Sequence, residues 1–120
     1  MKAKGAARKA ILGMVEKIRV GYDPERIILF GSYAYGEATE HSDIDLLVIK
    51  DDPRPPIDRR LAVKRLLREE NRAYALEVLV YRPKELKDRL AWGDDFLREI
   101  VSTGEELYAT PSQGRARVVW

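Results

Sequence analysis

The stretch that decides the fold of this chain reads Ile27-Ile28-Leu29-Phe30-Gly31-Ser32-Tyr33-Ala34-Tyr35-Gly36, then residues 37–41, then Ser42-Asp43-Ile44-Asp45-Leu46-Leu47-Val48-Ile49. It predicts a strand, a turn at Gly31, a short helical segment and a second strand that begins at two carboxylates. Side chains alternate between the two faces of a strand, so Asp43 and Asp45 project from the same side.

Two carboxylates on one side of a strand repel each other and resist burial. A Mg²⁺ ion removes this conflict, because hard cations prefer oxygen ligands such as carboxylates and phosphates. The alternative is a chance Asp-x-Asp pair on a solvated strand edge, preceded by an ordinary Gly-Ser turn. Apolar strands before Gly31 and after Asp45 favour the first interpretation, a metal-dependent site that handles phosphate.

The spacing of these residues resembles the signature of the DNA polymerase β-like nucleotidyltransferase superfamily, which is Gly-Ser, ten residues, then Asp-x-Asp. The fuller form, Gly31-Ser32-x-Ala34-x-Gly36…Ser42-Asp43-Ile44-Asp45-Leu46, resembles its minimal nucleotidyltransferase branch. The resemblance covers most of the chain, from the helix before Ile27 to Tyr108. It implies an α/β (α+β) fold, with helices packed on a small mixed β-sheet. Proteins of this branch often occur beside a small helical HEPN-domain protein, as a toxin–antitoxin system.

A third carboxylate, Glu77, interrupts the apolar run Ala75–Tyr81, which predicts the third strand. An unpaired charge buried in such a strand would cost several kcal/mol. One explanation is an ion pair with a nearby arginine. The other is a metal ligand brought beside Asp43 and Asp45 by strand pairing. The superfamily carries a third acidic residue on the matching strand, usually Asp, so the resemblance favours the ligand.

The resemblance also implies the roles of the site residues. Asp43, Asp45 and Glu77 are the expected catalytic residues and the expected ligands of two Mg²⁺ ions, with ATP as the substrate. Gly31 and Ser32 join the two aspartates in nucleotide binding. Gly31 lets the main chain approach a phosphate because it has no side chain, and Ser32 is expected to bind a phosphate oxygen through its hydroxyl and N–H.

Neighbouring residues receive lesser roles. Members of the superfamily often have arginine where this chain has Tyr33 and Tyr35. The alternatives for these two tyrosines are stacking, hydrogen bonding, acceptance of a nucleotide, and packing in the core. Gly36 is expected to permit a turn. Ser42 is expected to hydrogen-bond locally and to help aim Asp43. His41 is expected at the rim of the site and not as a general base.

Size and composition limit the remaining possibilities. With 120 residues, we expect one domain over residues 1–109 followed by a tail over 110–120. The absence of cysteine excludes disulfides and cysteine-bound metals, and a single histidine excludes histidine-rich metal sites. The net charge of +2 is too small for a dedicated nucleic-acid-binding protein. No apolar run approaches membrane-spanning length and no signal peptide is evident, so we expect a cytoplasmic protein without membrane contact. A homo-oligomer is compatible with the sequence.

The other elements follow from periodicity and turn residues. We expect helices over about 3–19, 57–72, 83–90 and 94–103, and an extended segment at 106–108. Residues 51–56 contain three prolines and predict a loop, expected at the rim of the carboxylate site. The basic face of the 57–72 helix, the Pro53–Pro56 loop and the Val118–Trp120 end are candidate contact surfaces.

The expected activity is transfer of a nucleoside monophosphate, AMP from ATP, onto a hydroxyl group. The leading acceptor is a tyrosine of a HEPN-type toxin, which would make the chain a protein adenylyltransferase and an antitoxin. One alternative is an antitoxin that neutralises a HEPN ribonuclease by contact without catalysis. The other is nucleotide transfer to RNA or to a small molecule.

Overall fold

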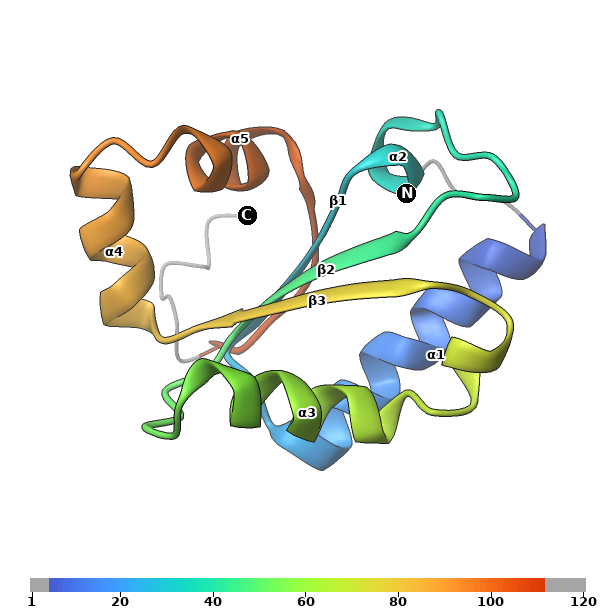
Figure 1. Ribbon diagram of the computed structural model, residues 1–120, viewed down its shortest axis with the longest axis horizontal. Coiled ribbons are helices and arrows are strands. Elements are labelled where there is room, and N and C mark those ends of the chain that lie inside the picture. Colours follow the sequence, from blue (N-terminus) through green and yellow to red (C-terminus); the bar gives the residue numbers. More distant parts are fainter. Residues whose placement is uncertain (1–4, 112–120) are drawn as a thin grey trace.

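A four-stranded sheet in the order β3-β2-β1-β4 organises residues 5–111, which the computed structural model describes (Figure 1). The strands are β1 (Arg26–Phe30), β2 (Ile44–Ile49), β3 (Leu76–Tyr81) and β4 (Glu105–Ala109). β1 is antiparallel to β2 and to β4, whereas β2 and β3 are parallel. The expected mixed sheet is therefore confirmed.

Helices cover both faces of this sheet. They are α1 (Gly5–Tyr22), α2 (Ser32–Tyr35), α3 (Pro56–Leu66), α4 (Pro83–Ala91) and α5 (Asp95–Thr103), with a 3₁₀ turn at Glu70–Arg72. α1 and α3 pack on one face, against the even-numbered residues of β2 and β3. α4 and α5 pack on the other face, against the cluster that includes Leu47 and Ile49. The strands between two helical layers are nearly continuous apolar runs for this reason.

α1 is an amphipathic helix, as its periodicity predicted. Ile11, Met14 and Ile18 are fully buried on one face. The helix continues three residues beyond the expected end, because Tyr22 also packs inward and the turn comes only at Asp23, which has a φ of 53°.

The helix expected over 57–72 is shorter than predicted. α3 ends at Leu66, and a separate 3₁₀ turn follows at Glu70–Arg72. The chain leaves the helix at Leu67, whose side chain is fully buried in the core. Burial of this leucine and the return of the chain to β3 outweigh the helical propensity of the next residues.

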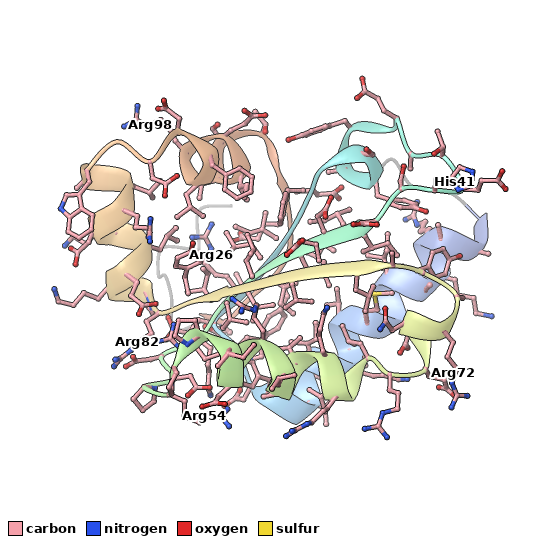
Figure 2. The ribbon with its side chains drawn as sticks, in the orientation of Figure 1. Arg26, His41, Arg54, Arg72, Arg82 and Arg98 are labelled. Atoms are coloured by element: carbon pink, nitrogen blue, oxygen red, sulfur yellow. The ribbon has the colours of Figure 1, made fainter. Side chains whose placement is uncertain are left out.

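The prediction that the 51–56 loop lies at the rim of the carboxylate site is wrong. This loop follows the carboxyl end of β2, whereas the two aspartates lie at its amino end, roughly 16 Å away along the strand. Figure 2 shows Arg54 of this loop and His41, beside the aspartates, on opposite sides of the molecule. The loop is instead held by buried Asp52, which accepts hydrogen bonds from the Tyr22 hydroxyl at 2.6 Å and from Arg54.

Candidate active site

Three carboxylates meet at the amino ends of β2 and β3. The parallel register places Asp45 opposite Glu77, and Asp43 lies just before the first residue of β2. Asp45 precedes Leu47 by two residues, so both side chains lie on the face that α4 and α5 cover farther along the sheet. Strand pairing thus brings together the three acidic residues that the sequence pattern singled out.

The surroundings of Asp45 oppose its negative charge. Asp45 is half-buried, while Asp43 and Glu77 are exposed. Burial raises the pKa of Asp45, and the negative charges of Asp43 and Glu77 raise it further, to about 6. The three side chains are therefore close enough for mutual repulsion, which a bound cation would relieve.

The expectation that Glu77 is a buried charge is wrong. Glu77 is exposed, because it is the second residue of β3 and lies where no helix covers the sheet. Its ion pair with an arginine, the alternative explanation, is absent from the described part of the chain. The charged neighbour that the structure gives Glu77 is Asp45, another carboxylate, and this pairing suits a metal ligand.

Gly31 stands directly against Asp45. Its φ of 74° is a conformation that favours glycine, and a Cβ atom there would lie 2.1 Å from Oδ2 of Asp45. β1 ends at Phe30, which pairs with Asp45 in the antiparallel register. The missing side chain at Gly31 therefore makes room for the carboxylate.

Ser32 begins α2 beside this glycine. The helix has only four residues, so its dipole contributes little at this end. The Ser32 side chain is half-buried and its hydroxyl makes no hydrogen bond within residues 5–111. The hydroxyl is thus free to bind a ligand, and its contact with phosphate stays a prediction.

The tyrosines and Gly36 complete α2. Tyr33 packs in the core with 7% of its surface exposed, and burial raises the pKa of its phenol. Tyr35 is half-buried, and its hydroxyl lies 2.9 Å from Oγ1 of Thr103 at the end of α5. Gly36 ends the helix with a φ of 81°, which confirms the expected turn. Core packing is therefore the observed role of Tyr33, and a tether to α5 that of Tyr35.

The loop from residue 37 to 43 carries the remaining predicted residues. Oγ of Ser42 accepts a hydrogen bond from the N–H of Thr39 at 2.8 Å, so its expected local bond is present next to Asp43. The His41 side chain is 88% exposed, and its nearest charged neighbour is Glu40 at 3.8 Å. This exposure agrees with a position at the rim.

The donor set suits a hard divalent cation. All three candidate ligands are carboxylates, which Mg²⁺ prefers. Among the residues that the structure describes, no three His, Asp or Glu side chains already surround one point closely enough to hold a metal ion. Asp43 and Glu77 are exposed, so packing does not prevent their side chains from turning toward Asp45.

Sequence reasoning missed the contact between Tyr35 and Thr103. These residues are 68 positions apart, and no local pattern links a tyrosine in α2 to a threonine at the end of α5. Thr103 also donates to the carbonyl of Glu99 at 2.7 Å, so the Tyr35 hydroxyl is left to donate to Thr103. The contact fixes α2, which carries Ser32, against the helix that covers the sheet.

Comparisons with known proteins identify the family of the chain. Residues 9–105 match the family model described as the nucleotidyltransferase domain. The chain is 41% identical over 73 residues to a Methanocaldococcus jannaschii protein named "Putative protein adenylyltransferase MJ1305", and the match covers 58% of this chain and half of that protein. It is 35% identical over 103 residues to "Putative protein adenylyltransferase MJ0604" of the same organism, covering 83% of this chain and 96% of that protein.

Solved structures share the fold. A Sulfolobus solfataricus protein described as "a putative nucleotidyltransferase" is 28% identical, with a TM-score of 0.52 over 68% of this chain and 70% of that one. A toxin–antitoxin structure with AMP-PNP is 22% identical, with a TM-score of 0.60 over 84% of this chain and 75% of that one. A mutant of the toxin–antitoxin MntA-HpeT is 20% identical, with a TM-score of 0.58 over 83% of this chain and 73% of that one. The chain belongs to the nucleotidyltransferase domain family and is a nucleotidyltransferase, as its motif predicted.

Proposed function

We propose that this nucleotidyltransferase transfers AMP from ATP to a hydroxyl group of a protein, in a Mg²⁺-dependent reaction. The observation that carries the proposal is the register of Asp45 with Glu77, beside Asp43, at the end of the sheet. Two relatives whose names describe protein adenylyltransferases support the choice of a protein acceptor.

In the proposed reaction the acceptor hydroxyl oxygen bonds to the α-phosphorus of ATP. The bond from that phosphorus to the bridging oxygen breaks, pyrophosphate leaves, and the hydroxyl proton is released. Bound Mg²⁺, held by Asp43, Asp45 and Glu77, would neutralise the triphosphate and activate the hydroxyl.

The protein itself mainly positions the reactants. Gly31 keeps the space beside Asp45 open, and its lack of a side chain lets a phosphate approach the main chain. Ser32 presents a free hydroxyl to a phosphate oxygen. The Tyr35–Thr103 contact holds α2, and so Ser32, in place.

The proposed acceptor is a tyrosine of a HEPN-type toxin, so that the chain acts as its antitoxin in the cytoplasm. Two of the structures with the same fold are toxin–antitoxin assemblies, and one of them contains AMP-PNP. No helix within residues 5–111 is both long and apolar enough to cross a membrane.

Intact-mass measurement tests the proposal. The chain is co-expressed with a HEPN-type protein from the same genome, then incubated with ATP and Mg²⁺. We expect the partner to gain the mass of one or more adenylates, and the Asp43→Asn/Asp45→Asn protein to produce none. A partner that binds and is neutralised without a mass change would establish the contact-only antitoxin. Transfer to RNA or to a small molecule alone would refute the protein acceptor.

A further inference from the structure

A groove lies between α3 and α4, against the last three residues of β3. Figure 1 shows α3 and α4 on either side of this strand. The groove encloses a cavity of about 450 Å³, which is within the size range of ligand sites. Arg60 of α3 lines one wall, Arg89 of α4 and Trp92 just beyond it line the other, and Leu79–Tyr81 form the floor. None of these residues belongs to the carboxylate site.

The floor of the groove is an open strand edge. β3 is the end strand of the sheet and pairs with β2 alone among the described strands. The N–H groups of Ile44 and Lys50 in or beside β2 donate to the carbonyls of Ala75 and Tyr81. In a parallel pair, alternate residues of a strand bond to the same neighbour, so Val78 and Val80 direct their N–H and C=O groups outward.

Natural proteins usually protect such an edge with proline, lysine or a bulge. β3 reads LEVLVY, pairs with β2 without a break in register, and contains neither proline nor lysine. An extended peptide can add to an edge of this kind through main-chain hydrogen bonds, while pockets beside the edge read its side chains.

Three arginines and two carboxylates, Glu85 and Asp88, line the groove, and Arg60 and Trp92 are the side chains in it that favour an acidic and partly apolar segment. Arg59 is buried and already paired with Glu85 at 2.7 Å, but half-buried Arg60 has no hydrogen bond or ion pair within residues 5–111. Arg89 is paired with Asp94 at 3.2 Å and lies over the ring of Tyr81, with its guanidinium carbon 5.8 Å from the ring centre. Trp92 is 78% exposed at the rim, where a large aromatic surface is available for contact.

The strand that forms the floor of the groove also carries Glu77. Tyr81 and Glu77 belong to the same strand, about 13 Å apart at the rise of an extended chain. A segment paired with β3 would lie about 4.8 Å from it. If one residue of such a segment lies beside Tyr81, then a residue about four positions away in the same segment lies beside Glu77.

We propose that this groove binds an extended segment of the acceptor protein as an added fifth strand. An acidic side chain of that segment meets Arg60, and a residue about four positions away presents its hydroxyl to the carboxylate site. The inference rests on the proposed transfer to a protein, and it names the surface that selects that protein.

Steady-state kinetics with the HEPN-type partner as acceptor tests the groove. Arg60→Glu and Trp92→Ala are the test variants, since both side chains are free of hydrogen bonds and ion pairs within the described chain. Lys87→Glu is the control: it reverses an exposed charge on α4 outside the groove. We expect each test variant to raise the KM for the acceptor about tenfold with unchanged kcat and unchanged KM for ATP, and the control to match the wild type.

Hydrogen exchange supplies a second readout. Binding of the acceptor should slow amide exchange at Val78 and Val80 in the wild type. The inference is refuted if the test variants match Lys87→Glu, if these amides remain unprotected, or if Arg60→Glu weakens transfer to RNA and not to protein. Groove variants that behave as wild type while transfer proceeds refute the groove alone. A wild type that binds Mg·ATP but modifies no protein refutes the proposed function together with the groove.

Discussion

A Cβ atom on residue 31 would lie 2.1 Å from Oδ2 of Asp45, and Gly31 has a φ of 74°. The two halves of the sequence motif, Gly-Ser and Asp-x-Asp, therefore pack directly against each other. The carboxylate occupies the space that a side chain on the turn would fill. This contact explains why the site needs glycine at this turn even before a nucleotide binds.

Gly31→Ala should lower the free energy of unfolding by about 2–4 kcal/mol, through overpacking and through the strained positive φ. In an Asp45→Ala background the clash disappears and only the φ strain remains. Urea unfolding of the four proteins in this double-mutant cycle should give a coupling energy of about 1 kcal/mol or more. Additive effects would mean that the turn moves away from Asp45 without cost.

Asp45→Asn should stabilise the metal-free protein at neutral pH. The folded-state pKa of Asp45 is raised to about 6, above the usual value near 4, so the folded state binds the proton more tightly than the unfolded state. The stability that this proton provides is present below about pH 4 and is lost as the pH rises to about 6.

For a half-exposed group, solvent screening reduces the cost to about 1–2 kcal/mol at pH 7.5. Denaturation should therefore show Asp45→Asn to be more stable than the wild type at pH 7.5 and equal to it near pH 4. Glu40→Gln, on the exposed loop, is the control and should change neither value. A destabilised Asp45→Asn at pH 7.5 would contradict the repulsion between the carboxylates.

Glu77→Gln should separate nucleotide binding from transfer. Asp43 and Asp45 remain to bind Mg·ATP, but one of the carboxylates expected to activate the hydroxyl is lost. Calorimetry should show similar Mg·ATP affinity, and the transfer rate should fall by orders of magnitude. Glu77→Asp tests the longer side chain, because the superfamily usually has Asp here, and should retain more activity than Glu77→Gln. Undiminished transfer by Glu77→Gln would remove Glu77 from the site.

Ser32→Ala should have a smaller effect than the loss of a carboxylate. The substitution removes one hydroxyl contact to phosphate and leaves the main-chain N–H. A hydrogen bond to a charged group contributes about 1.5–3 kcal/mol, so kcat/KM should fall about ten- to a hundredfold. The melting temperature should stay unchanged, because the hydroxyl has no partner within the described chain. A complete loss of activity would assign Ser32 a role beyond phosphate contact.

Asp52→Asn should destabilise the fold by about 2 kcal/mol at neutral pH, because its charged carboxylate is buried with bonds to Arg54 and Tyr22. These bonds hold the pKa of Asp52 well below its usual range. The stabilisation is present above about pH 4 and is lost as the pH falls, which is the opposite of Asp45. Tyr22→Phe removes one of the bonds and should cost about 1 kcal/mol. Equal stability of Asp52→Asn and wild type at pH 7 would contradict this network.

Local sequence patterns were sufficient for most of the elements. Apolar runs located β1, β2 and β3, and periodicity located α1 and its buried face. Asp94 and Gly104 marked the ends of α5 as expected, since Asp94 caps the helix through a hydrogen bond from the N–H of Leu97. Element ends that depend on distant packing were predicted less well. α3 stops at Leu66 because Leu67 turns into the core, and no residue near Leu67 signals this.

The sequence by itself determined the family and the strand–turn–strand unit that carries Asp43 and Asp45, because the spacing of Gly31, Ser32, Asp43 and Asp45 is a local property of that unit. The tertiary structure alone decided what depends on pairing between distant segments. The parallel register sets Glu77 opposite Asp45, and the uncovered end of the sheet leaves Glu77 exposed instead of buried. The position of β3 at the edge of the sheet likewise leaves Val78 and Val80 open to a further strand. A sequence pattern records which residues prefer a strand, whereas strand order and register arise from the packing of the whole chain.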